Sequence, residues 1–172
     1  MPAILFICTG NIFRSVVAEY ALKALVGPQS EYTISSAGIE ANPPRMDPLP
    51  PFISEHVRAK GVDLSMHVQR RLTHELLERA DLPVAMGLGH REFARQHFRR
   101  DIPLFNEICY GRAEPVLDIH EAVPDWSENL EAARSHAHFV IDYIWGAMPH
   151  FLKQVASRPE IWNETKALPP RP

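Results

Sequence analysis

The sequence predicts an α/β protein: a three-layer sandwich with a central four-stranded parallel sheet, Rossmann/flavodoxin-like. Two observations lead to this fold class. Short, continuous apolar runs alternate along the chain with longer amphipathic segments, as expected when helices cover both faces of a parallel sheet. The chain shows no repeat, and its 172 residues, 45% of them hydrophobic, are enough for one domain with a single core.

Four short apolar runs are the predicted strands. They are residues 3–8, 32–36, 82–86 and 103–108. The first run is apolar throughout, which is typical of a strand buried on both faces. Ligands of open α/β sheets bind beyond the carboxyl ends of the strands, so Cys8, at the end of the first run, is expected at a binding site.

Segments with helical periodicity follow the apolar runs. The predicted helices are residues 15–26, 52–60, 73–80 and 91–99, and a long amphipathic helix that begins near residue 130. Gly27 and Pro28 end the first helix, and Gly61 ends the second. Gly146 and Pro149 are expected to break or kink the last helix.

Proline is unusually frequent. The sixteen prolines are nearly twice the usual share of residues, which is about 5%. The prolines cluster in two places and bar regular structure in both. Residues 39–51 are therefore predicted to form a shaped surface loop. Residues 158–172 are predicted to be a poorly packed, proline-rich C-terminal extension that follows a domain of residues 1–157.

Charge and cysteine content exclude several classes of protein. The net charge of −3 argues against a nucleic-acid-binding face. No apolar stretch is long enough to span a bilayer, and the N-terminus lacks the features of a signal peptide. Two distant cysteines argue against a disulfide framework, so a cytoplasmic location is expected. We expect a monomer or weak dimer without membrane or nucleic-acid partners.

The loop that follows the first strand, Cys-Thr-Gly-Asn-Ile-Phe-Arg-Ser, has the residues of a phosphate-binding loop. A turn from a strand into a helix N-terminus offers backbone N–H groups and a partial positive charge to an anion. Gly10 permits close backbone approach or positive φ, and Asn11 can hold the turn. Arg14 can clamp two phosphate oxygens, and Ser15 can donate to the Cys8 thiolate, the form that attacks.

A lone cysteine at the end of a strand is more often a small buried hydrophobe. The glycine, asparagine, arginine and serine that accompany Cys8 favour the phosphate loop instead. The residues predicted to bind the substrate are Thr9, Gly10, Asn11, Ile12, Phe13, Ser15 and Trp126.

The loop resembles that of the low-molecular-weight protein tyrosine phosphatases, and the likeness covers roughly residues 3–155. Further matching segments are residues 35–38, Asp47-Pro48, the Gly-x-Asp-x-Ser-x-His-x-x-Arg stretch at 61–70, Ala85-Met86 and residues 123–125. The resemblance implies Cys8 as nucleophile, Arg14 as phosphate clamp and Asp125 as general acid. It also implies that Ser36 and His67 hydrogen-bond with Asn11 and brace the site.

The sequence departs from the family pattern around the expected cleft. Phe13 occupies the place of a second cysteine, Val16 that of a proline, and Gly87 that of an aspartate. The loop after residue 38 is about two residues short and lacks an aromatic near Asn42. Trp126 follows Asp125 directly, where the family has a proline first. These changes bear on substrate preference and efficiency.

The general acid has rival candidates. Asp125 matches by position, but Asp125-x-x-Glu128 before a helix is also a capping-box pattern. Asp118 is the main alternative and Glu121 a weaker one. The nine histidines show no ligand spacing, and the chemistry needs neither a metal nor a cofactor.

The expected function is hydrolysis of phosphotyrosine, in a protein or as a small aryl phosphate, through a phosphocysteine intermediate. Two alternatives stay open. A thioredoxin-coupled arsenate reductase would share the loop but needs resolving cysteines, and only Cys109 is present. A phosphate-binding regulatory module without turnover is the other.

Overall fold

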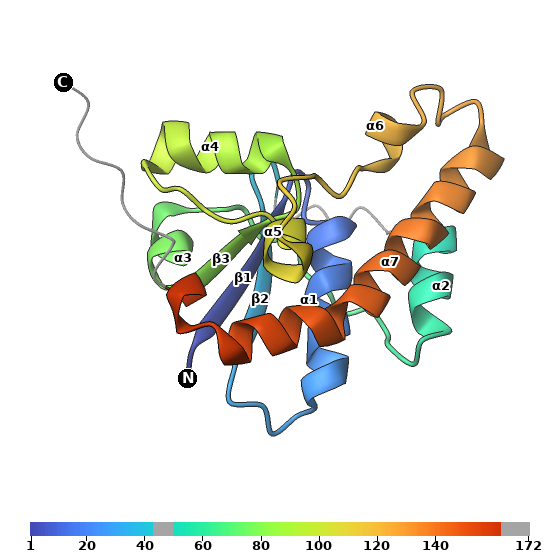
Figure 1. The fold of residues 1–172 in the computed structure, drawn as a ribbon. Coiled ribbons are helices and arrows are strands. Elements are labelled where there is room, and N and C mark those ends of the chain that lie inside the picture. Colours follow the sequence, from blue (N-terminus) through green and yellow to red (C-terminus); the bar gives the residue numbers. More distant parts are fainter. Residues whose placement is uncertain (43–49, 163–172) are drawn as a thin grey trace.

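The computed structural model describes residues 1–42 and 50–162, and its fold is shown in Figure 1. The elements in chain order are β1 (Ala3–Cys8), α1 (Arg14–Val26), β2 (Thr33–Gly38), α2 (Pro51–Arg58), α3 (His74–Glu78), β3 (Leu82–Ala85), α4 (Leu88–Phe98), α5 (Phe105–Tyr110), α6 (Ile119–Ala122), α7 (Leu130–Ser157) and the 3₁₀ helix η1 (Pro159–Trp162). The α/β class and the alternation of strands and helices are confirmed.

The sheet of the described residues has three parallel strands in the order β2-β1-β3, so the predicted fourth strand at 103–108 is wrong. Most of that segment is helix α5, and only one isolated bridge joins Leu104 to Ala85. Pro103 has no N–H to donate to a ladder. The Leu104 N–H donates instead to the Glu107 carboxylate, 2.8 Å away, which starts the helix.

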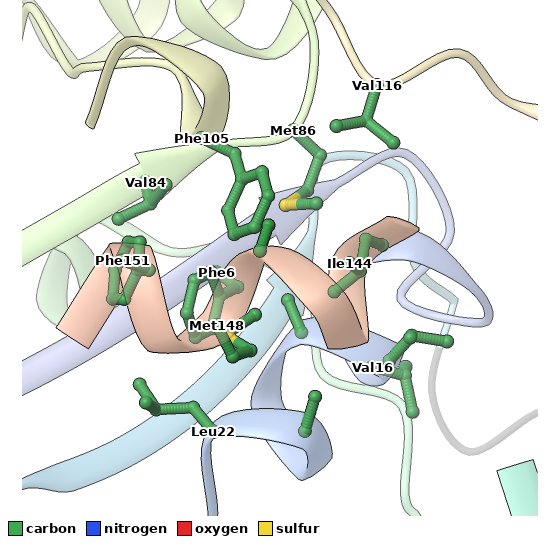
Figure 2. Packing of buried hydrophobic residues seen from close by; sticks show 14 of the residues in the cluster. Phe6, Val16, Leu22, Val84, Met86, Phe105, Val116, Ile144, Met148 and Phe151 are labelled. Carbon is green, nitrogen blue, oxygen red and sulfur yellow. The ribbon is translucent and has the colours of Figure 1, made fainter. Parts of the chain in front are cut away.

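Alternate residues of β1 face two different layers of helices. Ile4, Phe6 and Cys8 belong to the larger core cluster, shared with α1, α5 and α7. Leu5 and Ile7 belong to a smaller cluster shared with α3 and α4. Figure 2 shows part of the larger cluster, where the rings of Phe6, Phe105 and Phe151 gather between β1, α5 and α7. The sheet is therefore the middle of three layers.

The C-terminal part of the described chain packs more closely than its prolines suggest. Helix α7 continues through Gly146 and Pro149 to Ser157, so the predicted break is absent, but Figure 1 shows the helix bent along its length, in agreement with the alternative of a kink. Ile161 is buried in the larger core, and the Trp162 ring stacks on Tyr32 at 6.1 Å. The start of the predicted extension is thus part of the packed structure. Residues 43–49 of the proline-rich loop and 163–172 of the extension lie outside the described residues.

Candidate active site

The loop of residues 8–15 leads from the carboxyl end of β1 to the N-terminus of α1, and β2 ends beside it. A Cβ at Gly38 would lie 2.5 Å from the Thr9 carbonyl oxygen and 2.6 Å from the Asn11 nitrogen. Only glycine permits this approach. The Ile39 N–H donates to the Cys8 carbonyl at 3.0 Å and extends the contact. The family-like turn after β2 thus supports the loop from one side.

Asn11 holds the loop in shape from within. It has a φ of 53°, so the positive φ allowed for at Gly10 falls on Asn11, a residue type that tolerates it. Its Nδ2 donates to Ser15 Oγ at 3.1 Å and to Ser36 Oγ at 2.7 Å, and its Oδ1 accepts the Arg70 N–H at 2.8 Å. The expected Asn11–Ser36 hydrogen bond is therefore present.

Cys8 lies at the start of this network. Its Sγ is 2.9 Å from Ser15 Oγ, and the residue is only 2% exposed. Ser15 lies in the first turn of α1, whose N-terminal end carries partial positive charge. A thiolate at Cys8 would accept a hydrogen bond from Ser15 in this environment, as the sequence predicts.

The network continues to Glu19, a buried carboxylate that sequence reasoning missed. Glu19 accepts hydrogen bonds from Ser36 Oγ and from Lys23 Nζ, both at 2.5 Å. Its position four residues after Ser15, on the same face of α1, was the available signal. The chain of contacts therefore runs from Cys8 through Ser15, Asn11 and Ser36 to a buried negative charge.

His67 lies beside this network and contacts Asn11 through the backbone of that residue. Its Nε2 is buried without a hydrogen-bond partner, and its ring packs edge-on against Tyr20 at 5.7 Å. Burial lowers the pKa of His67, and Glu19 opposes the shift. A hydrogen bond between the His67 ring and the Asn11 backbone also opposes the shift, so the expected contact is made through the backbone of Asn11, and packing against Tyr20 adds to it.

Arg14 is buried beside the loop and is held by groups that arrive from α6 and the segment before it. It is 1% exposed. Its Nη1 donates to the Val116 carbonyl at 2.8 Å and to Glu121 Oε2 at 3.1 Å, and its Nη2 donates to Asp118 Oδ2 at 2.6 Å. Its Nε is buried without a partner. An oxyanion in the loop could take that nitrogen, the donor which the protein leaves free.

Asp118 and Glu121 are fixed relative to one another by the short helix α6. Asp118 is the N-cap, and its Oδ1 accepts the Ile119 N–H at 2.7 Å. Glu121 Oε2 accepts the Asp118 N–H at 2.6 Å, which completes a capping box. The capping box predicted at Asp125 is thus found seven residues earlier, where Asp118 and Glu121 contact Arg14.

Asp125 and Trp126 lie after α6 and are exposed, Trp126 by 46%. The Asp125 carbonyl accepts the N–H groups of Glu128 and Asn129, and Asn129 caps α7 through a hydrogen bond from the Ala132 N–H. Within the described residues, the Asp125 side chain makes no hydrogen bond or ion pair. The structure therefore brings Asp118, the alternative candidate, to Arg14 and does not bring Asp125 there.

The other loop residues differ in what they can contribute. Thr9, Gly10 and Ile12 are partly exposed, whereas Phe13 is 5% exposed and packs in the larger core. Phe13 can therefore offer its backbone but not its ring to a substrate. Across residues 1–42 and 50–162, no group of three or more His, Cys, Asp or Glu side chains could hold a metal ion.

His90 joins the site from α4, and no sequence pattern predicts its contact there. Its Nε2 is 3.0 Å from Thr9 Oγ1, and the residue is 4% exposed. Burial lowers the pKa of His90 to about 4, and the charge of Arg14 adds to the shift. The ring is therefore neutral near pH 7.

Known proteins resemble this chain over most of its length. The family model for low molecular weight phosphotyrosine protein phosphatase matches residues 3–158. A protein-arginine-phosphatase of Bacillus subtilis is 36% identical over 119 residues, 67% of this chain and 77% of that protein. A low molecular weight protein-tyrosine-phosphatase of Acinetobacter johnsonii is 36% identical over 94 residues, 54% of this chain and 62% of that protein. An arsenate reductase of Staphylococcus epidermidis is 35% identical over 83 residues, 48% of this chain and 58% of that protein.

Solved structures resemble the whole fold. A YwlE arginine phosphatase with a phosphorylated active-site serine matches with a TM-score of 0.75 and 26% identity, over 92% of this chain and 99% of that chain.

Proposed function

The chain belongs to the low molecular weight phosphotyrosine protein phosphatase family, and on this premise we propose that it hydrolyses phosphotyrosine with Cys8 as the nucleophile. One observation carries the proposal. Cys8, at the carboxyl end of β1, lies 2.9 Å from the hydroxyl of Ser15 in the first turn of α1, and the same loop carries a buried arginine with a free Nε. This arrangement suits an enzyme that attacks a phosphate and stabilises its charge.

The reaction proceeds in two steps. The Cys8 thiolate attacks phosphorus, the P–S bond forms, the P–O bond breaks, and a carboxylic acid gives its proton to the departing phenolic oxygen. A water molecule then attacks the phosphocysteine, gives a proton to the same carboxylate, and releases inorganic phosphate and the thiolate. Arg14 and the loop amides bind the equatorial oxygens in both steps. The related structure with a phosphorylated active-site serine supports a covalent step of this kind.

We assign the acid–base role to Asp118 in preference to Asp125. Asp118 contacts Arg14 at 2.6 Å and is 20% exposed, so a substrate held by Arg14 lies within its reach. In this place its carboxyl group can give a proton to the leaving oxygen in the first step and take one from the attacking water in the second.

The assignment is tested with substrates that differ in leaving group. Asp118→Asn is expected to lower kcat by 10²-fold or more on phenyl phosphate and less on p-nitrophenyl phosphate, whose leaving group needs little protonation. Asp125→Asn and Glu121→Gln are the matched controls. A loss in Asp125→Asn that exceeds the loss in Asp118→Asn would return the role to Asp125.

Tyrosine is the proposed substrate side chain, and arginine is the second candidate. The aliphatic side chain of Ile12 is partly exposed in the loop and suits an aryl group, and the exposed Trp126 is the aromatic that we propose to contribute to substrate binding. The arginine phosphatases among the relatives favour the other substrate. We expect kcat/KM for phosphotyrosine to exceed that for phosphoserine and phosphoarginine at least tenfold, and Trp126→Ala to raise KM more than it lowers kcat. Equal or faster turnover of phosphoarginine would reverse the assignment.

The rival functions make different predictions. Arsenate reduction needs a reactive second thiol, but Cys109 is 4% exposed and burial raises its pKa to about 12. A regulatory module would bind phosphate without turnover. Hydrolysis of p-nitrophenyl phosphate that is lost in Cys8→Ser excludes the module and supports the phosphatase.

We infer a cytoplasmic enzyme that acts on phosphoproteins. Its two cysteines are free and buried, which fits a reducing compartment. In the part of the chain that the structure describes, no helix has the length and apolarity to cross a bilayer.

A further inference from the structure

The contact between His90 and Thr9 joins two elements that are far apart in sequence. Thr9 follows the nucleophile directly, so its backbone is part of the phosphate loop. His90 lies in the first turn of α4, and its Nε2 meets Thr9 Oγ1 at 3.0 Å. In Figure 1, α4 begins near the carboxyl ends of the strands and runs away from them. The contact thus fixes the side chain next to Cys8 to a rigid helix.

Gly87 provides the space that His90 occupies. A Cβ on Gly87 would lie 3.3 Å from both Cε1 and Nδ1 of His90 and 3.5 Å from Nη1 of Arg14. The φ of Gly87 is −155°, a value that any residue adopts, so the backbone does not require glycine here. The tight contact with the ring is what disfavours a side chain. The lack of a side chain at Gly87 therefore makes room for the ring of His90.

The surroundings of His90 favour a neutral ring that acts through a single contact. Arg14 is close to the ring, and its charge opposes protonation, while Asp118 acts weakly in the other direction. Nδ1 is buried without a partner, so the Thr9 hydroxyl is the group that the ring binds. A leucine would fill the same space more simply if packing were the only role.

We infer that His90 is a positioning residue of the phosphate loop, which holds the Thr9 hydroxyl and thereby the backbone beside the nucleophile, in a space that Gly87 keeps open. The inference rests on the proposed function, since the loop is taken to bind the phosphate of the substrate. A small displacement of such a loop is costly, because its donors must match the oxygens of the transition state.

The first test compares two neutral amides at position 90. Glutamine reaches the place of Nε2, whereas asparagine reaches only that of Nδ1. His90→Leu and His90→Asn are expected to lower kcat/KM for p-nitrophenyl phosphate about tenfold and to raise the inhibition constant of inorganic phosphate by a similar factor. His90→Gln should stay within about threefold of wild type. A merely structural role would not separate glutamine from asparagine in this way.

The second test asks whether His90 acts through Thr9. Thr9→Val removes the hydroxyl at nearly constant volume and should lower kcat/KM as much as His90→Leu does. The double variant should have a kcat/KM no lower than that of either single variant. Gly87→Ala should weaken phosphate binding in the wild type but add no loss to His90→Ala. Melting temperatures are measured throughout; if His90→Leu fails to fold, Thr9→Val and the two amides carry the test.

Three results would overturn the inference: His90→Leu within twofold of wild type, asparagine equal to glutamine, or losses that multiply in the double variant. Phosphate binding is also read from the protection of Cys8 against alkylation by iodoacetamide. That readout does not need turnover. A wild type that binds phosphate without hydrolysis would refute the proposed function while the His90 variants still decide this inference.

Discussion

At the scale of single residues, Arg14 must bind several groups of the protein and the substrate phosphate with one side chain. One guanidinium binds two carboxylates and a carbonyl while one nitrogen stays free. A substrate phosphate must take that nitrogen and share the others with Asp118 and Glu121. The planar shape of the group, which allows several donors to act at fixed angles, is therefore as necessary as its charge.

Arg14→Lys is accordingly expected to reduce kcat/KM for p-nitrophenyl phosphate by more than tenfold, about 1.4 kcal/mol in the activation barrier, although it keeps the charge. Arg79→Lys, at the exposed C-cap of α3, is the matched control and should leave the rate unchanged. A loss of less than tenfold in Arg14→Lys would show that no two-pronged clamp is made.

Cys109 is expected to play no part in protection from oxidation. Its Sγ lies under α7, 4.0 Å from the Ala147 carbonyl, and its raised pKa keeps it as a thiol. Phe13 stands where the family has a neighbouring cysteine. Excess peroxide should therefore drive Cys8 towards the sulfinic acid, and dithiothreitol should not restore activity. Cys109→Ala should behave identically; recovery in wild type but not in this variant would identify Cys109 as a resolving thiol.

Residues of the site differ in how far the sequence reveals them. Cys8 to Ser15 are contiguous, so their composition and the strand-to-helix context predict a phosphate loop. Asp118 and Asp125 each begin an Asp-x-x-Glu pattern, and local sequence cannot decide between them. The decision depends on where the segment before α7 passes Arg14. The contacts of Glu19 and His90 are hidden for the same reason, because they arise only when elements meet.

At the scale of elements, the sequence predicts buried strands well and the segment after α4 poorly. Residues 103–108 have the apolar composition of a strand, yet Pro103 and Glu107 turn the segment into a helix. Helix α7 shows the opposite case. Gly146 and Pro149 are residues that commonly end helices, but the buried stripe around them includes Ile144 and holds the helix continuous.

Gly146 should consequently be a site where stability can be gained. A Cβ there would meet nothing within 4 Å, and alanine favours a helix over glycine by about 1 kcal/mol. Gly146→Ala is expected to raise the free energy of unfolding by about 0.5–1 kcal/mol in urea titrations, without a change in m. Gly111→Ala is the contrast: Gly111 ends α5 with a φ of 68°, so this change should destabilise. Equal effects of the two variants would contradict the argument.

At the scale of the whole molecule, the three layers meet at the carboxyl ends of the strands. Within a small volume this edge brings together the loop after β1, the first turn of α4 and the carboxylates of α6. Burial of a neutral histidine there links the folding of the entire chain to pH. The pKa of His90 is about 4 in the folded protein, against about 6.5 when unfolded.

Between these values the unfolded chain binds more protons than the folded one, so stability rises with pH. The contribution of His90 is complete above about pH 6.5 and is lost as the pH falls towards 4; it is on the order of 3 kcal/mol. His67, whose pKa is also lowered, acts in the same direction. Urea titrations between pH 7 and 4.5 should therefore show that the free energy of unfolding falls less with decreasing pH in His90→Gln than in wild type. His74→Gln, at a side chain that is 61% exposed, should keep the wild-type slope. If the free energy of unfolding depended on pH in the same way in wild type and His90→Gln, the imidazole would have to be protonated or accessible in the folded protein. That result would contradict the contact of a neutral His90 ring with Thr9.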